Sequence, residues 1–197
     1  ILILSNVKNF YELYGKKCNG IFSSRNVLDK WIASKLNLMI RNVTNSLDDY
    51  NTINACNEIA SFIDDLSTWY VRRSKDRFNN KEKDAVETLS YVLINLAKVM
   101  APITPFIAEE IHQMFRKHNK KLLESVHLDS WPKYDDTLIS EKLNNEMQKT
   151  REIVSMALEE RAKVKIPIRQ VLNKLEINGI ELDKEYLDLI REEVNVK

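Results

Sequence analysis

The stretch LDKWIASKLNLMIRNVTNSL, which runs from Leu28 to Leu47, decides the fold of this 197-residue chain. Its large apolar residues recur at intervals of three and four positions, at Leu28, Ile32, Leu36, Met39, Val43 and Leu47. This period places them on one face of an α-helix. Ser23, Ser24 and Asn26 precede the stretch and can cap the first turn with their side-chain oxygens. The stretch therefore predicts a long amphipathic helix that packs against other elements.

The same apolar spacing occurs in two further stretches. One begins at about Thr52 and has the apolar face Cys56, Ile59, Ile63, Leu66 and Tyr70. The other carries Val86, Leu89, Leu93, Leu96, Met100 and Ile103. A fourth helix is predicted from Pro105, whose fixed φ suits a first helical position, to about Phe115, and a fifth over residues 140–163. Long amphipathic helices joined by short connections favour an antiparallel bundle.

Composition also indicates a mainly α protein. With 44% hydrophobic residues the chain can bury a core, and 3 Gly and 4 Pro are too few turn-forming residues for an all-β sandwich. The placement of these glycines excludes a Gly-rich phosphate loop. Cys18 and Cys56 form neither a metal-ligand pair nor a disulfide framework, which predicts reduced thiols in the cytoplasm. The apolar start Ile1–Leu4 is too short for a signal peptide or a membrane span.

The chain divides into four predicted segments. We expect an entry segment over residues 1–22, the helical bundle over 23–135, a connecting long helix over 136–165 and a small α+β appendage over 166–197. In the appendage, residues 166–169 and 172–177 have strand-like composition, Asn178-Gly179 is a turn signal, and 184–193 is helical again. Residues 126–132 are expected to be extended. The missing initiator Met indicates a piece of a longer polypeptide.

The sequence predicts no catalytic or metal-binding constellation. Glu109 and His112 lie three positions apart on one helix, but no second ligand pair with metal-site spacing accompanies them. Carboxylate pairs such as Asp64-Asp65 are adjacent, so the two side chains do not share a helix face. We expect structural roles for all of these residues.

Charge is balanced over the whole chain, at a formal net +1, but is segregated locally. Between residues 70 and 83, six bases stand against two acids. The strongest feature is DLSTWYVRRSKDRF, from Asp65 to Phe78, in which an aromatic pair passes directly into a basic helix end. Such cations offset the helix macrodipole, and guanidinium groups also suit phosphate oxygens. Trp69 and Tyr70 either stack on a nucleic-acid base or fill the core.

A second basic run lies between residues 161 and 174, with five bases and no acid. Lys163, Lys165 and Arg169 in this run form a second candidate anion contact, although a solvated edge explains them almost as well. The segment 176–193, with seven acids against two bases, follows directly and is able to mask it. A loop cluster is expected to serve only surface solubility: Arg116, Lys117, Lys120 and Lys121.

Several stretches, taken in order, resemble the isoleucyl-tRNA synthetases. The run Trp69–Phe78 is similar to their Trp-Tyr-x-Arg-Arg segment, and residues 28–37 are similar to the first helix of their anticodon domain. Residues 100–111 match a turn typical of class I synthetases for aliphatic amino acids. Further agreement comes from residues 125–128, 131–132, 161–170 and 193–197. The resemblance covers about residues 6–197, and departs from the family at Asp76 and Asn79, where relatives often have a base and a Trp.

This resemblance implies an anticodon-binding helical bundle with the start of the region after it. The parent enzyme would attach isoleucine to its tRNA using ATP and magnesium, whereas this piece would need no cofactor and would only hold the tRNA. The family's ATP-binding signatures, His-x-Gly-His and Lys-Met-Ser-Lys-Ser, are absent from the sequence. The entry segment would lead in from the catalytic domain of the same parent chain.

The resemblance also suggests which residues contact RNA. Arg72, Arg73, Lys75 and Arg77 would bind phosphates of the anticodon stem-loop, while nearby aromatic residues such as Trp69 and Tyr70 read unstacked bases. Two alternatives remain open at this point. The chain could be the equivalent domain of a valyl-tRNA synthetase, which shares the Pro-Ile-Thr-Pro turn. It could also be a helical scaffold that packs on other protein domains without contacting RNA.

Overall fold

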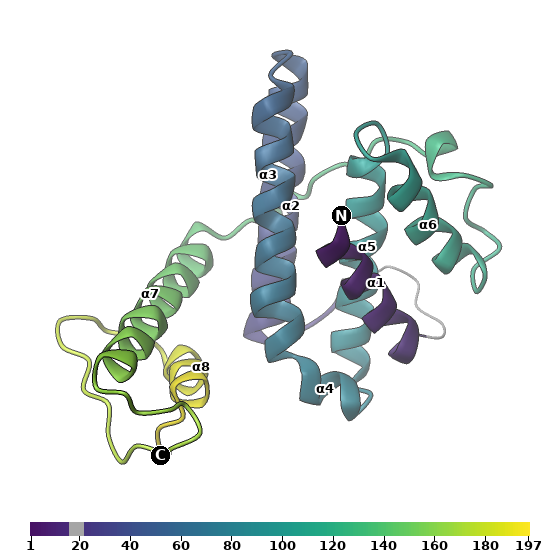
Figure 1. Cartoon of the computed structure of the whole chain (residues 1–197). Coiled ribbons are helices and arrows are strands. Elements are labelled where there is room, and N and C mark those ends of the chain that lie inside the picture. Colours follow the sequence, from purple (N-terminus) through teal and green to yellow (C-terminus); the bar gives the residue numbers. More distant parts are fainter. Residues whose placement is uncertain (16–21) are drawn as a thin grey trace. The chain divides into compact units, whose positions relative to one another are not determined.

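The computed structural model describes residues 1–15 and 22–197, which form two compact units, Ile1–Ile139 and Ser140–Lys197 (Figure 1). The boundary falls immediately before the long helix that was expected to connect two parts. Cys18 and Gly20 lie outside the described residues. Cys56 is an exposed free thiol. Within the described residues, no helix is both long enough and apolar enough to cross a membrane.

The first unit contains six described α-helices, of which the sequence predicts all except the first and the short fourth. They are α1 (Leu2–Tyr14), α2 (Val27–Asp48), α3 (Thr52–Asp64), α4 (Lys75–Asn79), α5 (Lys83–Met100) and α6 (Pro105–Arg116). The π-helical turn η1 (Asp65–Val71) joins α3 to the residues before α4, and two short 3-10 turns follow α6, η2 (Val126–Leu128) and η3 (Asp136–Leu138). Helix α2 begins where predicted, because Asn26 Oδ1 accepts a hydrogen bond from the Leu28 amide at 2.9 Å.

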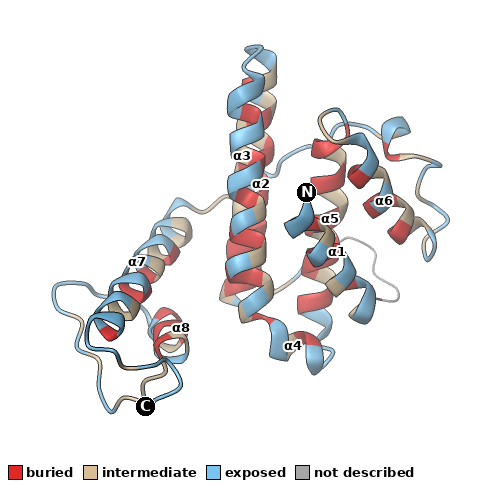
Figure 2. Cartoon of the chain, in the orientation of Figure 1, coloured by how far each residue is buried: buried red, intermediate tan, exposed pale blue. Residues whose placement is uncertain are grey.

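The core of this unit lies between α2, α3 and α5. Figure 1 shows α2 and α3 as a long antiparallel pair, and the buried residues of these helices follow the faces that they turn toward their neighbours (Figure 2). On α2, the predicted face is buried from Leu28 to Val43, and only Leu47 at the far end is half-exposed. Each fully buried Leu or Ile side chain stabilises the fold by about 1.5–3 kcal/mol.

The apolar face of α3 differs from the predicted one. Cys56 is exposed and Ile63 is only half-buried, whereas Ala55 and Phe62 are buried together with Ile59. The predicted face, read at three- and four-residue spacing up to Tyr70, assumed a single regular α-helix. The structure instead widens into a π-helical turn at Asp65, and within this turn Leu66 and Tyr70 are buried as predicted. In α3 itself the buried face passes through Ala55 and Phe62 and is shifted by one position from the predicted one.

The predicted entry segment contains α1, which belongs to the core of the first unit. Leu4, Val7 and Tyr11 are buried, and the ring of Tyr11 lies 5.0 Å from that of Phe115. Lys8 on the same helix pairs with Glu110 on α6 at 2.6 Å. The first turns of α1 therefore contribute to this unit and do not merely lead into it.

Glu109 on α6 organises the segment that follows α6. Its Oε2 accepts hydrogen bonds from the Ser125 hydroxyl and the Val126 amide, both at 2.9 Å. Residues 126–132 were expected to be extended, and this prediction is wrong for the 3-10 turn Val126–Leu128. Local hydrogen bonds explain the turn, because Ser125 accepts from the His127 amide and the Asp129 amide donates to the Val126 carbonyl.

The contacts of Glu109 predict an acid-sensitive segment. Partial burial raises the pKa of Glu109, but the hydrogen bonds from Gln113, Val126 and Ser125 lower it more, so the net shift is downward. A carboxyl whose pKa is lowered on folding stabilises the fold above its unfolded pKa, and this stabilisation is lost as the pH falls through the folded pKa. We expect Glu109→Gln to lower Tm at pH 7 and to flatten its decline between about pH 5 and pH 3.

Glu124→Gln, at an exposed position of the same segment, is the matched control. Thermal melts at several pH values provide the measurement. Equal pH profiles for Glu109→Gln and the unaltered chain would show that Glu109 does not govern this acid sensitivity.

The second unit consists of α7 (Glu141–Lys163), α8 (Lys184–Val194) and irregular chain between them. Ser140 caps α7 by accepting a hydrogen bond from the Leu143 amide at 3.3 Å. The two helices contact each other through buried residues. These are Met147, Ile153 and Val154 on α7 and Tyr186, Leu189, Ile190 and Val194 on α8. Helix α7, expected to be a connector, thus forms half of this core.

The predicted strands 166–169 and 172–177 are wrong. The described residues of this unit contain a single parallel bridge, between Leu172 and Val196, in place of a sheet. Pro167 has no amide to donate to a ladder. Gly179 does adopt the left-handed φ of +79° that the Asn-Gly turn signal predicts. The flanking segments, however, would form a hairpin of about three residues a side, and an isolated two-stranded hairpin is at best marginally stable.

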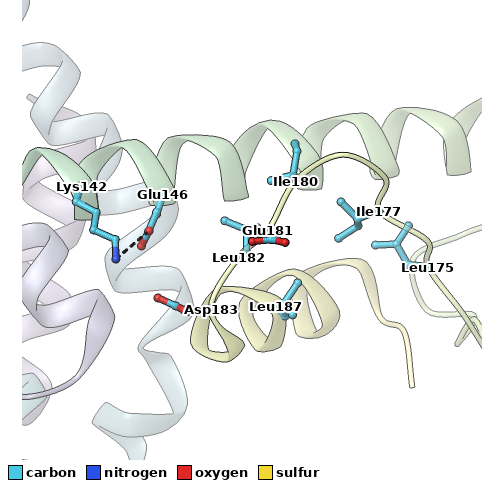
Figure 3. Close-up of a pocket in the computed structure, with 9 residues that line it drawn as sticks. All are labelled: Lys142, Glu146, Leu175, Ile177, Ile180, Glu181, Leu182, Asp183 and Leu187. Carbon is cyan, nitrogen blue, oxygen red and sulfur yellow. Dashed lines mark ion pairs between the residues drawn. The ribbon is translucent and has the colours of Figure 1, made fainter.

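The residues that were predicted to form the hairpin line an open pocket instead (Figure 3). This pocket has a volume of about 730 Å³. Leu175, Ile177, Ile180 and Leu182 contribute apolar side chains from the irregular segment, and Leu187 contributes one from α8. The alternating apolar residues that resemble a strand are therefore only half-buried or exposed around this pocket.

Arg161 holds the ends of the second unit together. Its side chain is buried and its guanidinium donates hydrogen bonds to the carbonyls of Val194, Pro167 and Gln170. These carbonyls belong to the end of α8 and to the irregular segment. Arg161, although it is part of the basic run between residues 161 and 174, therefore has a structural role.

Replacing Arg161 by Met should destabilise the second unit by about 3 kcal/mol, because three backbone carbonyls lose a charged donor, and the Val194 carbonyl loses it at a buried position. Lys163→Met, at an exposed site two residues away, is the control. Amide hydrogen exchange provides the measurement, since protection should fall in α8 and stay unchanged in α2. Unchanged protection in α8 would contradict this role of Arg161.

Candidate nucleic-acid interface

The basic segment, Arg72–Lys75, directly follows a π-helical turn that α2 holds in place. The turn spans Asp65–Val71 and contains the aromatic pair. At its start, the buried Asp65 carboxylate pairs with Lys35 on α2 at 3.0 Å. Toward its end, the Tyr70 hydroxyl donates to Asp29 on α2 at 2.9 Å. Short π-helical turns inside helices occur frequently at functional sites.

The fully buried carboxylate of Asp29 is the centre of this arrangement. Arg77 donates to both of its oxygens, at 2.8 and 2.7 Å, in a bidentate pair. The Ser24 hydroxyl donates at 2.6 Å, in addition to the bond from Tyr70. Because a buried charge is costly without partners, these four donors explain how the carboxylate is tolerated. They connect the start of α2 to the turn and to α4.

The electrostatic effects on Tyr70 and Arg77 agree with this geometry. Burial raises the pKa of Tyr70 well above its ordinary value, and the charge of Asp29 raises it further. Burial lowers the pKa of Arg77, but its hydrogen bonds to Asp29 and the charge of that carboxylate more than offset the effect, so the net shift is upward. Tyr70 is therefore a neutral donor and Arg77 a permanent cation near neutral pH.

Replacing Arg77 by Met should destabilise the first unit by about 3–5 kcal/mol, because it leaves the Asp29 carboxylate buried without its bidentate partner. Tyr70→Phe removes one donor to the same buried carboxylate and should cost about 1.5–3 kcal/mol. Lys75→Met, in the same segment at an exposed position, is the matched control. Urea unfolding measures all three variants. A loss for Arg77→Met no larger than that of the control would contradict the structural role of Arg77.

The structure separates the predicted contact residues of this segment into two groups. Trp69 and Tyr70 are buried, so they fill the core, one of the two roles that the sequence left open. Arg77 faces Asp29 and also donates to Glu82 at 2.9 Å. Arg72 and Lys75 are exposed and Arg73 is half-buried. The structure thus brings three of the four predicted cations to the surface of one short segment.

Neighbouring cations at the start of α2 belong to the same region. Arg25 and Lys30 are exposed and flank Asp29 in the chain. Asp29 binds Arg77, which is 48 positions away, so the start of α2 and α4 lie close together. No local pattern in the sequence signals this proximity, since it arises from a tertiary ion pair.

The second predicted anion contact lies in the second unit. Lys163 pairs with Glu160 at 2.7 Å and with Glu159 at 3.5 Å, and the hydrogen bond to Glu160 raises its pKa. Lys165 and Arg169 are exposed. The charge of Lys163 is therefore partly compensated within the unit, whereas the other two present their charge to solvent.

His112 and Glu109 have structural roles. A ring nitrogen of His112 lies 2.9 Å from the Leu123 carbonyl, and Glu109 binds the segment after α6. In the part of the chain that the structure describes, no group of three or more His, Cys, Asp or Glu side chains is arranged to hold a metal ion. The exposed cations Arg72 and Lys75 remain the candidate site of the first unit.

Comparison with known proteins places this arrangement in a family. The family model described as "Anticodon-binding domain of tRNA ligase" matches residues 29–177, which include Asp29, the π-helical turn and α4. This chain belongs to that family. The conclusion agrees with the predicted fold class, a mainly helical bundle of a class I synthetase anticodon-binding domain.

Curated relatives of this anticodon-binding domain are isoleucine–tRNA ligases. The protein from Clostridium tetani is 40% identical over 206 residues, which cover 98% of this chain and 20% of the relative. The protein from Cutibacterium acnes is 44% identical over 178 residues, which cover 88% of this chain and 16% of the relative. The chain thus spans about a fifth of the length of the curated relatives that it matches.

A solved structure also matches in part. It is the crystal structure of the ternary complex of Agrobacterium radiobacter K84 agnB2 LeuRS-tRNA-LeuAMS, which is 21% identical in sequence and matches with a TM-score of 0.47. The match covers 70% of this chain and 16% of that one.

Proposed function

We propose that this anticodon-binding domain holds the anticodon stem-loop of an isoleucine tRNA as part of a longer isoleucine–tRNA ligase. The observation that carries the proposal is the basic segment Arg72–Lys75, which follows a π-helical turn fixed by Asp29 and Asp65. The relatives named as isoleucine–tRNA ligases support the choice of amino acid over valine. The longer protein would use ATP and magnesium elsewhere, and would act in the cytoplasm.

In this proposal, the cations of the basic segment Arg72–Lys75 bind the RNA backbone. Guanidinium and ammonium groups bind phosphate oxygens without reading sequence, so they set the register of the stem-loop. Arg72 and Arg73 are followed by Lys75 within a single turn, and Arg25 and Lys30 extend the positive surface. Binding energy gained here would orient the distant acceptor end of the tRNA for reaction in the catalytic part of the enzyme.

Further contacts extend the proposal to the partners of the domain. Lys165 and Arg169 of the second unit would add a weaker phosphate contact, with Lys163 limited by its acidic neighbours. The exposed apolar side chains of Ile1, Leu2 and Leu13 on or next to α1 would pack on the catalytic domain of the same parent chain. A helical scaffold that makes only such protein contacts is the competing function.

RNA binding should depend on salt and on the exposed cations. With three phosphates engaged, the log–log slope of affinity against salt should be about −2 to −3, and Arg72→Ala with Lys75→Ala should reduce it to about −1. Fluorescence anisotropy of a labelled isoleucine-tRNA anticodon stem-loop measures both quantities. A valine-tRNA stem-loop tests whether the domain by itself distinguishes the two tRNAs.

Lys120→Ala with Lys121→Ala is the matched double variant, because it removes two exposed lysines from the loop after α6. It should leave the slope and Tm unchanged. Equal effects of the two double variants would indicate nonspecific attraction, and no binding at low salt would favour the scaffold. A fall in Tm that matches the loss of affinity would show that Arg72 or Lys75 acts through folding.

A further inference from the structure

A single tryptophan of this chain presents its ring to solvent. Trp31 and Trp69 are buried, whereas Trp131 is 37% exposed. The indole nitrogen of Trp131 donates to the Thr44 hydroxyl on α2 at 2.9 Å. This hydrogen bond fixes the orientation of the ring while leaving part of it open, and aromatic rings held in this way are stacking surfaces for nucleic-acid bases.

Trp131 lines a cavity in the first unit. This cavity has a volume of about 240 Å³ and is also lined by Lys98, Pro102, His127, Asp129 and Ser130. This volume is below the range of about 300–1,000 Å³ typical of sites for drug-sized ligands, and suits a single heterocycle. Its walls come from the end of α5, from the turn after α5 and from residues 126–131. The first of these residues, Val126, donates a hydrogen bond to Glu109 on α6.

The polar groups of the cavity match the edge of a base. Lys98 and Asp129 form an ion pair at 2.9 Å. Asp129 also accepts a hydrogen bond from the Ser130 amide at 2.8 Å. The pair places a strong donor beside a strong acceptor, which is the pattern that base edges present. Two other ligands fit the cavity less well than a base. A free phosphate would be repelled by the negatively charged Asp129, and an aliphatic side chain could not form a hydrogen bond with Lys98 or Asp129.

We propose that this cavity takes one unstacked base from the loop of the RNA, with the base stacked on Trp131 and its edge bonded to Lys98 and Asp129. The inference rests on the proposed function, which supplies the RNA. Helix α5 separates this cavity from the phosphate contacts, since Lys98 is near its end and Lys75 precedes its start. Its 18 residues span about 27 Å, a distance that a stem and its loop can bridge.

The intrinsic fluorescence of Trp131 reports directly on base stacking. Because Trp31 and Trp69 are buried, a base stacked on Trp131 should quench the exposed part of the intrinsic fluorescence. We would titrate the chain with the isoleucine-tRNA anticodon stem-loop and with versions that carry an abasic site at each loop position in turn. We expect quenching by the intact loop, and loss of quenching for one abasic position only.

Two substitutions separate stacking from structure. Trp131→Ala should weaken binding by about tenfold or more, because it removes one base-stacking contact. Trp131→Phe loses the same hydrogen bond to Thr44 but keeps an aromatic ring, so it should retain most of the affinity. Phe106→Ala is the control, since Phe106 is an exposed aromatic residue that does not line the cavity.

The outcomes distinguish this inference from the proposed function. RNA that binds the chain by anisotropy, without quenching and with full affinity for Trp131→Ala, would overturn the base site and leave the phosphate contacts standing. Equal losses for Trp131→Ala and Trp131→Phe would overturn it as well, because they would assign the effect to the hydrogen bond. No binding of RNA to the unaltered chain at low salt would overturn the proposed function itself.

Discussion

The buried carboxylate of Asp29 is the constraint on which the first unit depends. It lies in the first turn of α2, where the helix dipole favours a negative charge, and it receives hydrogen bonds from Ser24, Tyr70 and Arg77. A carboxylate in this position without these donors would cost several kcal/mol. The chain around residues 70–77 must therefore return to the start of α2, and this return fixes where the basic segment lies.

The same constraint explains the π-helical turn. Tyr70 reaches Asp29 and Asp65 reaches Lys35, so both ends of the turn are tied to one helix. The wider turn accommodates both contacts while Trp69 stays in the core. As a result the cations that follow lie on a backbone that two ion-paired or hydrogen-bonded contacts to α2 hold in place.

The second unit shows a related use of a buried cation. Arg161 belongs to a basic run, yet its guanidinium donates to the carbonyls of Val194, Pro167 and Gln170. Arg77 similarly belongs to a basic run and binds Asp29. In both units, an arginine from a basic run is therefore bonded to other groups of the protein. The number of bases in a segment therefore overestimates the number that can reach a phosphate.

The sequence by itself determined α2, α3, α5, α6, α7 and α8, because apolar spacing, the Asn26 cap and Pro105 act within a few residues of the chain, but it did not indicate α1, α4 or the π-helical turn. Together with the ordered motifs, it also identified the family. Only the tertiary structure decided which residues face solvent. Trp69 and Tyr70 enter the core and the predicted strands near Leu172 do not form, since burial and strand pairing depend on partners distant in the chain. The pairing of Asp29 with Arg77 and of Trp131 with Thr44 arises in the same way, from contacts that no local pattern encodes.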